Sequence, residues 1–336
     1  MHTRRGDLAP HVTPRFRIVS TLALAAVVVL LAARPADAAA LARAASSSTG
    51  DLLTWWKAAI LGIVEGVTEY LPISSTGHLL VTSRLLGLPD VKGTKGLEAV
   101  NTYAIAIQFG AILAVLGLFW KRFRDMVLGL FGKNPDGLHL LITLVIAFLP
   151  AAILGAALDK KIEDALFGPW PVVVAWIAGG ILILVLERTG RIPDRGVPAA
   201  EVGHNPLAAI TYRQALIIGL AQCVALWPGT SRSLATILGA LLVGVAMPAA
   251  VEFSFLLGFA TLSAATAFKL VKDGGNLVEQ FGVVNPLIGA FFALVSAVLA
   301  IRWLITYLER HDLSIFAWYR FAVAGITIAL LAGSVI

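Results

Sequence analysis

The sequence predicts an all-α, polytopic membrane protein: an inverted-topology repeat with six transmembrane helices and two re-entrant helical hairpins. Three observations lead to this prediction. Of the 336 residues, 58% are hydrophobic and 14% are charged, whereas about a quarter of the residues in soluble domains are charged. The apolar residues form runs long enough to cross a bilayer core of ~30 Å. Two further apolar segments are each interrupted by a polar stretch with proline and glycine.

This composition excludes several classes of protein. A soluble domain this apolar would have too few polar residues to cover its surface. An ordinary cytosolic enzyme, a disordered chain and a nucleic-acid-binding protein are therefore excluded. The net charge of +6 comes from short basic clusters between apolar runs, as in the loops of multi-span membrane proteins. The single cysteine, Cys223, excludes an intrachain disulfide and a cysteine-rich metal site.

Residues 1–50 form a signal-like or anchor segment followed by a linker. Arginines precede an apolar run over 18–33, and an Ala-x-Ala sequence follows at 36–38. This order is typical of a secretory signal peptide, and an uncleaved membrane anchor explains it equally well. In both cases the basic end stays in the cytoplasm, so Asp51 starts on the outer face. A single membrane-embedded domain then covers 51–336.

Six apolar runs in this domain predict the transmembrane helices. They cover about 101–120, 138–158, 171–187, 249–268, 285–305 and 316–335. The two interrupted segments are 55–88 and 212–247, with polar stretches at 71–78 and 227–233. Irregular backbone at membrane depth is stable only where it is buried in protein or lines a wet cavity. Both segments are therefore predicted to be re-entrant hairpins.

The two halves of the domain, about 51–190 and 211–336, resemble copies of one unit. One alignment places Ser74 on Ser231, and two looser matches follow in the same order. Coincidence between apolar sequences is the alternative explanation. Each half holds a hairpin and three spans, an odd number, so the second half would enter the membrane upside down. That plan is known from transporters, with a site near the repeat interface.

The basic residues of the loops predict the orientation. Lys and Arg are more frequent after the first and third spans than after the second and fourth. By the positive-inside rule, the first pair of loops is cytoplasmic. The first hairpin would then open to the outer face of the membrane, and the chain would end outside.

The first hairpin carries the strongest functional signal. Glu65 and Glu69 are four residues apart, so they share one face of a helix. Carboxylates inside a membrane are costly and are functional candidates by default; a protonated or backbone-capped pair is the alternative. A carboxylate, a hydroxyl and an imidazole close together can supply a base, a nucleophile and an acid. The polar residues that follow are Ser74, Ser75, Thr76 and His78.

Arg232 is the central residue of the second hairpin. Ser231 and Ser233 flank it, and Thr236 follows one turn later. A guanidinium among hydroxyls and turn amides suits an oxyanion with several oxygens, and phosphate is the obvious candidate. The alternative is a structural ion pair with a glutamate of the other hairpin, which is compatible with a resting site.

Weaker candidates lie elsewhere in the apolar runs. Gln108 and Glu252 occupy roughly equivalent positions in the two halves. Each could line a cavity, and a packing hydrogen bond explains each equally well.

Two motifs resemble the signatures of the undecaprenyl-diphosphatase family, also called bacitracin resistance proteins. The first is EGVTEYLPISSTGH from Glu65 to His78, and the second is PGTSRSLAT from Pro228 to Thr236. The resemblance covers about 51–336. It implies hydrolysis of undecaprenyl diphosphate to the monophosphate, which recycles the lipid carrier of peptidoglycan synthesis and confers bacitracin resistance. It also implies the inverted-repeat fold and a divalent-cation requirement. The family's functional positions fall on Glu65, Glu69, Ser75, His78 and Arg232.

This resemblance leads to a prediction for each site residue. Ser75 would attack the terminal phosphorus, with His78 as the rival nucleophile. Glu69 would accept the proton, directly or through His78, and Arg232 would neutralise charge on the transferring phosphoryl group. Glu65 and Glu69 would hold Mg²⁺ or Ca²⁺. The substrate phosphates would also contact Ser74, Thr76, Ser231, Ser233 and Thr236.

Two other functions share parts of this pattern. The short Ser/Thr-rich stretches around His78 and Arg232 also resemble type 2 phosphatidate phosphatases, but the histidine which that family has shortly after the arginine is missing here. A polyprenyl-phosphate flippase, with or without hydrolysis, would share the inverted-repeat architecture. The expected partners are the lipid substrate and membrane lipids, without nucleic acid, and a homodimer stays open. The expected location is the bacterial plasma membrane, with the site open to the outer face.

Overall fold

The computed structural model describes residues 53–89, 94–192 and 206–336. The signal-like segment and its linker lie outside the described residues. Residues 49–336 form one compact unit. In its described part the secondary structure is entirely helical, from α3 to α13 with one short 3₁₀ helix, η2. This confirms the predicted all-α class.

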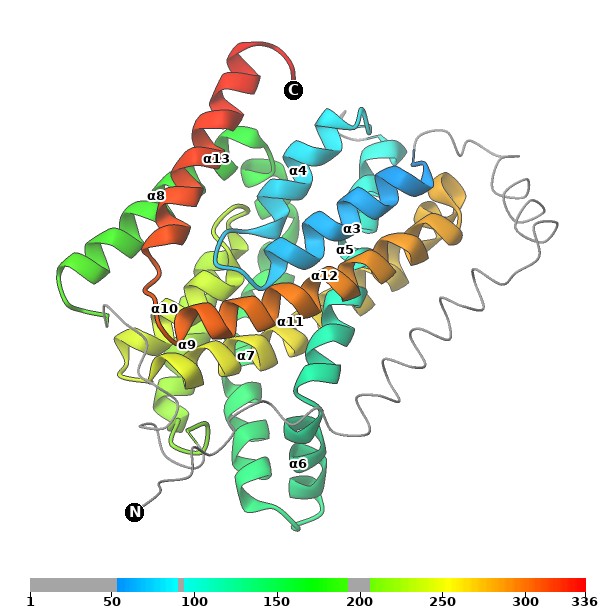
Figure 1. Cartoon of the computed structure of the whole chain (residues 1–336). Coiled ribbons are helices and arrows are strands. Elements are labelled where there is room, and N and C mark those ends of the chain that lie inside the picture. The colour runs from blue at the N-terminus through cyan, green and yellow to red at the C-terminus, as the bar shows by residue number, and fades with distance from the viewer. Residues whose placement is uncertain (1–52, 90–93, 193–205) are drawn as a thin grey trace, which may run out of the picture. The chain divides into compact units, whose positions relative to one another are not determined.

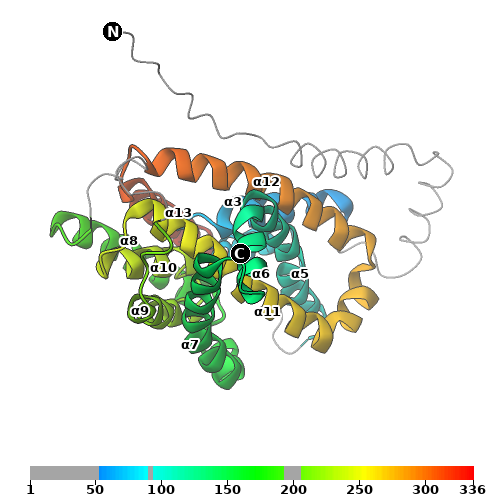
Figure 2. The same cartoon turned by 90° about the horizontal axis from the view of Figure 1, so that it is seen from below.

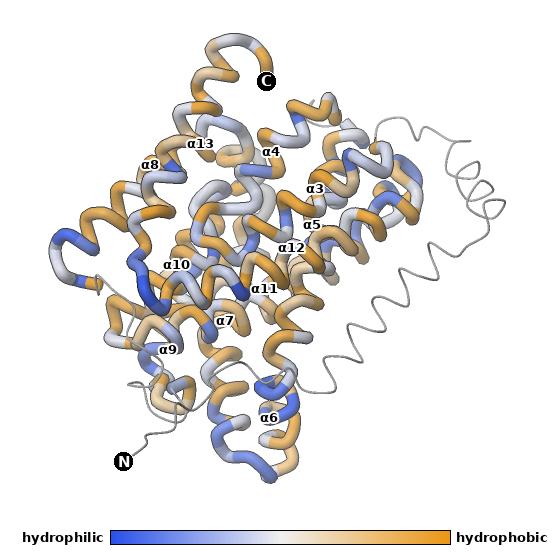
Figure 3. Tube along the Cα trace, viewed as in Figure 1, coloured by the Kyte–Doolittle hydropathy of each residue, from blue (hydrophilic) through white to orange (hydrophobic). Residues whose placement is uncertain are grey.

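Six of the described helices are long and apolar enough to cross a membrane, as predicted. Figure 3 shows that apolar residues dominate along them. They are α5 (Lys95–Leu118), α7 (Pro135–Leu166), α8 (Pro169–Arg188), α11 (Met247–Phe281), α12 (Val284–Leu308) and α13 (Ser314–Ala332). The short helix α6 (Trp120–Leu130) connects α5 to α7. The chain is therefore a multi-pass membrane protein.

Two helices are clearly longer than their apolar runs. Helix α7 continues past the predicted end near 158 to Leu166, and α11 is the second. The run predicts an end for α11 near 268, but the helix continues to Phe281. Lys269 and Asp273 lie one turn apart there and form an ion pair of 2.7 Å. Such pairs support a helix beyond its apolar part.

Both interrupted segments fold as helix–turn–helix pairs. The first pair is α3 (Trp55–Glu69) and α4 (Ser75–Leu85). In the second pair, α9 (Tyr212–Gln222) runs through η2 (Cys223–Leu226) to a turn and α10 (Arg232–Leu242). The residue before each second helix has nearly the same unusual backbone, with φ 74° and ψ 107° at Ser74 and φ 78° and ψ 116° at Ser231. These are the residues that the sequence alignment pairs. The inverted topology and the re-entrant placement stay predictions.

Helices of the first half pack directly on helices of the second half. Helix α12 lies against α3 and α5, α11 against α5, α13 against α8, and α7 against α9 (Figure 1, Figure 2). Added methyl groups at Gly62, Gly66 or Gly110 would collide with the backbone of α12. Small residues of this kind let membrane helices approach closely. The two turns are brought together by this interlocked packing.

Candidate active site

The turn of the first pair lies against the turn of the second pair. The hydroxyls of Ser231 and Ser233 donate hydrogen bonds to the carbonyl oxygen of Leu71, at 3.4 and 2.9 Å. Both serines are buried. The backbone N–H of Ile73 also donates to this carbonyl, at 2.7 Å, so a backbone donor of the first turn and two side chains of the second turn meet at Leu71.

Glu69 connects residues of both turns. The Ser75 hydroxyl donates a hydrogen bond to one carboxylate oxygen, and the Arg232 Nη2 atom donates to the other at 3.2 Å. The exposed fractions of the Arg232 and Glu69 side chains are only 10% and 7%, so solvent screens this ion pair weakly. The arrangement has the geometry of a nucleophile beside its base. It also contains an ion pair between Arg232 and Glu69. A structural ion pair of this kind is the alternative role that the sequence predicts for Arg232.

Arg232 is held in place on several sides. Its Nη1 atom donates to the carbonyl oxygen of Ser254 at 3.1 Å, and its guanidinium lies 5.8 Å from the ring centroid of Tyr70. An added methyl group at Gly258 would collide with the guanidinium. Within the described part of the chain, the Nε atom of Arg232 is buried without a hydrogen-bond partner. The Nε–H group is therefore available to an oxyanion.

Glu65 is fully buried one helical turn before Glu69. Among the described residues, neither of its carboxylate oxygens has a hydrogen-bond partner. A buried carboxylate without donors must be neutral or balanced by a cation. Its free oxygens suit a hard cation such as Mg²⁺ or Ca²⁺. The described residues contain no cluster of three or more His, Cys, Asp or Glu ligands, so substrate oxygens and water would have to complete the coordination.

The hydrogen-bond partners of His78 are Ser74 and Tyr319. Its Nδ1 atom lies 2.6 Å from the carbonyl oxygen of Ser74, and its Nε2 atom lies 2.9 Å from the hydroxyl of Tyr319. A carbonyl only accepts, so Nδ1 carries the proton, and in the neutral imidazole Nε2 accepts from Tyr319. In this arrangement His78 forms a hydrogen bond with neither Glu69 nor Ser75, although all three residues are described. A proton relay through His78 stays a prediction.

A cavity of about 170 Å³ lies between the two turns. The predicted residues that line it are Glu69, Ser74, Ser75, Thr76, Ser231 and Arg232. Four other predicted residues do not line it: Glu65, His78, Ser233 and Thr236. The Thr236 hydroxyl instead donates to the carbonyl oxygen of Arg232 at 2.9 Å, within its own helix. The cavity is a polar chamber with Arg232 and Glu69 in its wall.

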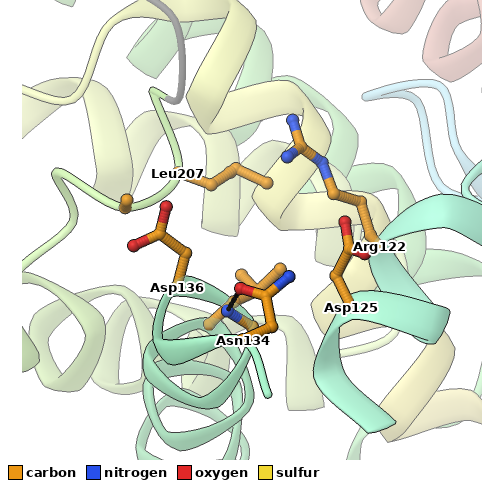
Figure 4. Close-up of a pocket in the computed structure, with 8 residues that line it drawn as sticks. Arg122, Asp125, Asn134, Asp136 and Leu207 are labelled. Atoms are coloured by element: carbon orange, nitrogen blue, oxygen red, sulfur yellow. Dashed lines mark hydrogen bonds between the residues drawn. The ribbon is translucent and has the colours of Figure 1, made fainter. Parts of the chain in front are cut away.

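The two weaker candidates have different surroundings. Gln108 lines the cavity between the turns. Glu252 instead forms an ion pair of 2.7 Å with Arg122. Arg122 lines a second cavity, of about 190 Å³, together with Asp125, Asn134 and Asp136 (Figure 4). The sequence could not separate the two candidates, because both stand in apolar runs.

Sequence reasoning missed several residues around the site. On α11, the carbonyl of Ser254 accepts a hydrogen bond from Arg232, and Gly258 leaves room for the guanidinium. On α13, Tyr319 forms a hydrogen bond with His78. Their neighbourhood depends on helix packing, which motifs do not encode. Arg320, also on α13, could have been found from the sequence, because a charged residue within an apolar span is a functional candidate by default.

The fold and site define a multi-pass membrane protein with a polar chamber between two helix–turn–helix pairs. The chain belongs to the bacitracin resistance protein BacA family, whose model matches residues 58–326. It is 43% identical to an undecaprenyl-diphosphatase of Sorangium cellulosum, over 82% of this chain and 86% of that protein. It is 45% identical to undecaprenyl-diphosphatase 2 of Rhodospirillum rubrum, over 83% and 96%. These findings confirm the family resemblance.

Proposed function

We propose that this chain hydrolyses undecaprenyl diphosphate to undecaprenyl phosphate and inorganic phosphate. The observation that carries the proposal is the contact of Ser75 and Arg232 with the two oxygens of Glu69, at the wall of one cavity. The names of the similar proteins support the same substrate. The reaction would return the lipid carrier to cell-wall synthesis and underlie the bacitracin resistance in the family's name.

In the proposed mechanism, Ser75 is the nucleophile. Its oxygen bonds to the terminal phosphorus, Glu69 takes the hydroxyl proton, and the phosphoanhydride bond breaks to release undecaprenyl phosphate. Water then hydrolyses the phosphoserine, and the serine oxygen recovers its proton from Glu69. Arg232 stabilises charge on the transferring group, where most of the catalysis of phosphoryl transfer lies.

Two observations bear on the choice of nucleophile. The Ser75 hydroxyl already points to a carboxylate, whereas the Nε2 atom of His78 accepts a hydrogen bond from Tyr319. Attack by His78 would first require this hydrogen bond to break. Trapping the covalent intermediate tests the proposal: we expect an acid-stable phosphate on Ser75, and an acid-labile phosphate on His78 would contradict it.

Glu65 and Glu69 are the residues that would hold a divalent cation. When bound, Mg²⁺ or Ca²⁺ would neutralise charge on the diphosphate. The free oxygens of Glu65 support this role, and Glu69 contributes the second carboxylate one turn away. We expect a chelator to abolish turnover and Mg²⁺ or Ca²⁺ to restore it.

We infer that the protein lies in the bacterial plasma membrane with the cavity open to the outer face. The uneven loop charges support this orientation. In Figure 1, the end of α13 and helix α4 lie at one end of the unit, and the connection between α6 and α7 lies at the other. The connection between α6 and α7, which the loop charges place inside, is therefore well separated from the end of α13, which is predicted to lie outside.

The decisive experiment measures phosphate release by the purified protein in detergent. Undecaprenyl and farnesyl diphosphates are the substrates, with and without chelator. Detergent leaves no second compartment, so release of phosphate identifies an enzyme and not only a flippase. We expect release by the wild type and none by Ser75→Ala. A wild type that releases no phosphate, although folded and supplied with cation, would contradict the proposed function.

A further inference from the structure

Arg320 is a fully buried arginine on α13 that hydrogen-bonds only to backbone. A guanidinium has five N–H donors, and here five carbonyl oxygens accept from it. Nε donates to Trp176 at 3.2 Å, Nη1 to Pro72 at 3.2 Å and Thr230 at 3.0 Å, and Nη2 to Ala175 at 2.8 Å and Gly229 at 3.1 Å. No carboxylate of the described residues forms an ion pair with it.

These carbonyls belong to three separate parts of the chain. Pro72 lies in the first turn, Gly229 and Thr230 lie in the second turn, and Ala175 and Trp176 lie in α8. Residues of a turn lack the helical partners that would otherwise satisfy their carbonyls, and a buried carbonyl without a partner is costly. One guanidinium therefore satisfies backbone groups of both turns at once.

The other carbonyls of the first turn also accept from side chains. Leu71 accepts from the two serines of the second turn, Ile73 accepts from Trp176 Nε1 at 2.9 Å, and Ser74 accepts from His78. The path of this turn is thus fixed by hydrogen bonds from outside it. Among the described side chains that donate to carbonyls of the first turn, only Arg320 also donates to carbonyls of the second turn.

We propose that Arg320 is a positioning residue, which fixes the first turn against the second so that Ser75 and Glu69 face Arg232. This inference rests on the proposed function. Ser75 and Glu69 flank the first turn, and Arg232 directly follows the second turn. All five donors of Arg320 are occupied, so it has none left for a phosphate. Arg232 differs, because its Nε atom has no partner among the described residues.

Gly179 on α8 makes room for this guanidinium. An added methyl group at Gly179 would collide with the Nη2 and Cζ atoms of Arg320. Gly179→Ala therefore disturbs Arg320 from a second helix, without removing its charge or any of its donors. It serves as an independent variant for the same proposal.

The test compares Arg320→Lys and Gly179→Ala with the wild type. Lysine keeps the charge but has three donors for five carbonyls. Because a displacement of about 1 Å in a catalytic group can cost ~10²-fold, we expect kcat to fall about 10²-fold in Arg320→Lys and ~10-fold in Gly179→Ala, with KM within ~3-fold. Arg310→Lys, at an exposed turn residue just after α12, is the matched control and should keep the wild-type kcat.

A double-mutant cycle with Arg232→Lys separates positioning from general damage. If Arg320 acts by placing Ser75 and Glu69 against Arg232, the fold-loss of kcat in the double variant will be smaller than the product of the two single fold-losses. Wild-type kcat in Arg320→Lys, or losses that simply multiply, would overturn the proposal. If Arg320→Lys cannot be purified in folded form, Gly179→Ala and its own cycle with Arg232→Lys decide.

Hydrogen exchange provides a readout that does not depend on activity. Arg320 binds both turns, so we expect amides near 71–75 and near 229–232 to exchange faster together in Arg320→Lys. Unchanged exchange in either turn would contradict the proposal. If the wild type is inactive but both turns still exchange faster in Arg320→Lys, the proposed function is refuted and the link between the turns is supported.

Discussion

The two arginines that contact the turns, the fully buried Arg320 and the largely buried Arg232, have different chemistry. Arg232 pairs with Glu69, and its Nε atom has no hydrogen-bond partner among the described residues. Arg320 pairs with no described carboxylate and uses every donor on backbone. A binding group must exchange its resting partners for substrate, whereas a positioning group must not. This difference assigns the phosphate to Arg232.

Replacing Arg232 by lysine tests this assignment. Lysine keeps the charge but loses the planar fork that binds two oxygens at once. We expect kcat/KM of Arg232→Lys to fall at least ~10²-fold, as when a transition-state donor is removed. Steady-state phosphate release measures the effect. Near-normal turnover would reject the phosphate role and favour a structural ion pair with Glu69.

Gly258 offers an indirect test of the same residue. An alanine there would push the Arg232 guanidinium out of its place, at a typical cost of about 1–3 kcal/mol for overpacking. We expect Gly258→Ala to lower kcat/KM by ~10-fold or more. Gly325→Ala on α13 is the control, because nothing lies within 4 Å of an added methyl group there. Equal activity of the two variants would show that Arg232 tolerates displacement.

The motifs predicted the polar residues of the cavity but not what holds them. Glu69, Ser75 and Arg232 could be named because each stands in a short polar stretch within an apolar segment. Tyr319 is far from His78 in sequence and reaches it because α13 and α4 both pack against α8. Contacts of this kind depend on tertiary packing, which hydrophobic periodicity does not encode.

At the scale of the elements, the matched turns are the distinctive feature. Ser74 and Ser231 both have positive φ, which is uncommon for residues other than glycine and costs on the order of 1–3 kcal/mol. Each directly precedes a helix that carries a site residue, Ser75 in α4 and Arg232 in α10. Such strain persists only where surrounding contacts impose it, and the side chains that bind the first turn's carbonyls provide those contacts.

Substitutions at Ser74 test this strain. Its side chain caps no backbone group of α4, so glycine should relieve the backbone at little cost, whereas a β-branched residue should increase the strain. We expect the free energy of unfolding in detergent to be higher for Ser74→Gly than for Ser74→Val, by about 1–3 kcal/mol. Thermal or denaturant unfolding measures it. Equal stability of the two variants would contradict a strained turn.

At the scale of the whole unit, the chamber depends on both halves of the chain. The first half supplies Glu69 and Ser75, and the second supplies Arg232, because helices of the two halves interlock. The six spans could be predicted from apolar runs alone, since length and composition define them. The pairing of α12 with α3 could not, because small residues such as Gly66 reveal close packing without naming the partner helix.

The orientation of this unit in the membrane gives the last prediction. If the loops obey the positive-inside rule, the start of α5 lies outside and the end of α8 lies inside. Lys95 and Arg191 are exposed at these two ends. In a Cys223→Ser background, we expect Lys95→Cys to react with a membrane-impermeant thiol reagent in intact cells. Arg191→Cys should react only after the membrane is opened. The opposite labelling pattern would place the chamber on the cytoplasmic face, where it could not receive carrier diphosphate released outside.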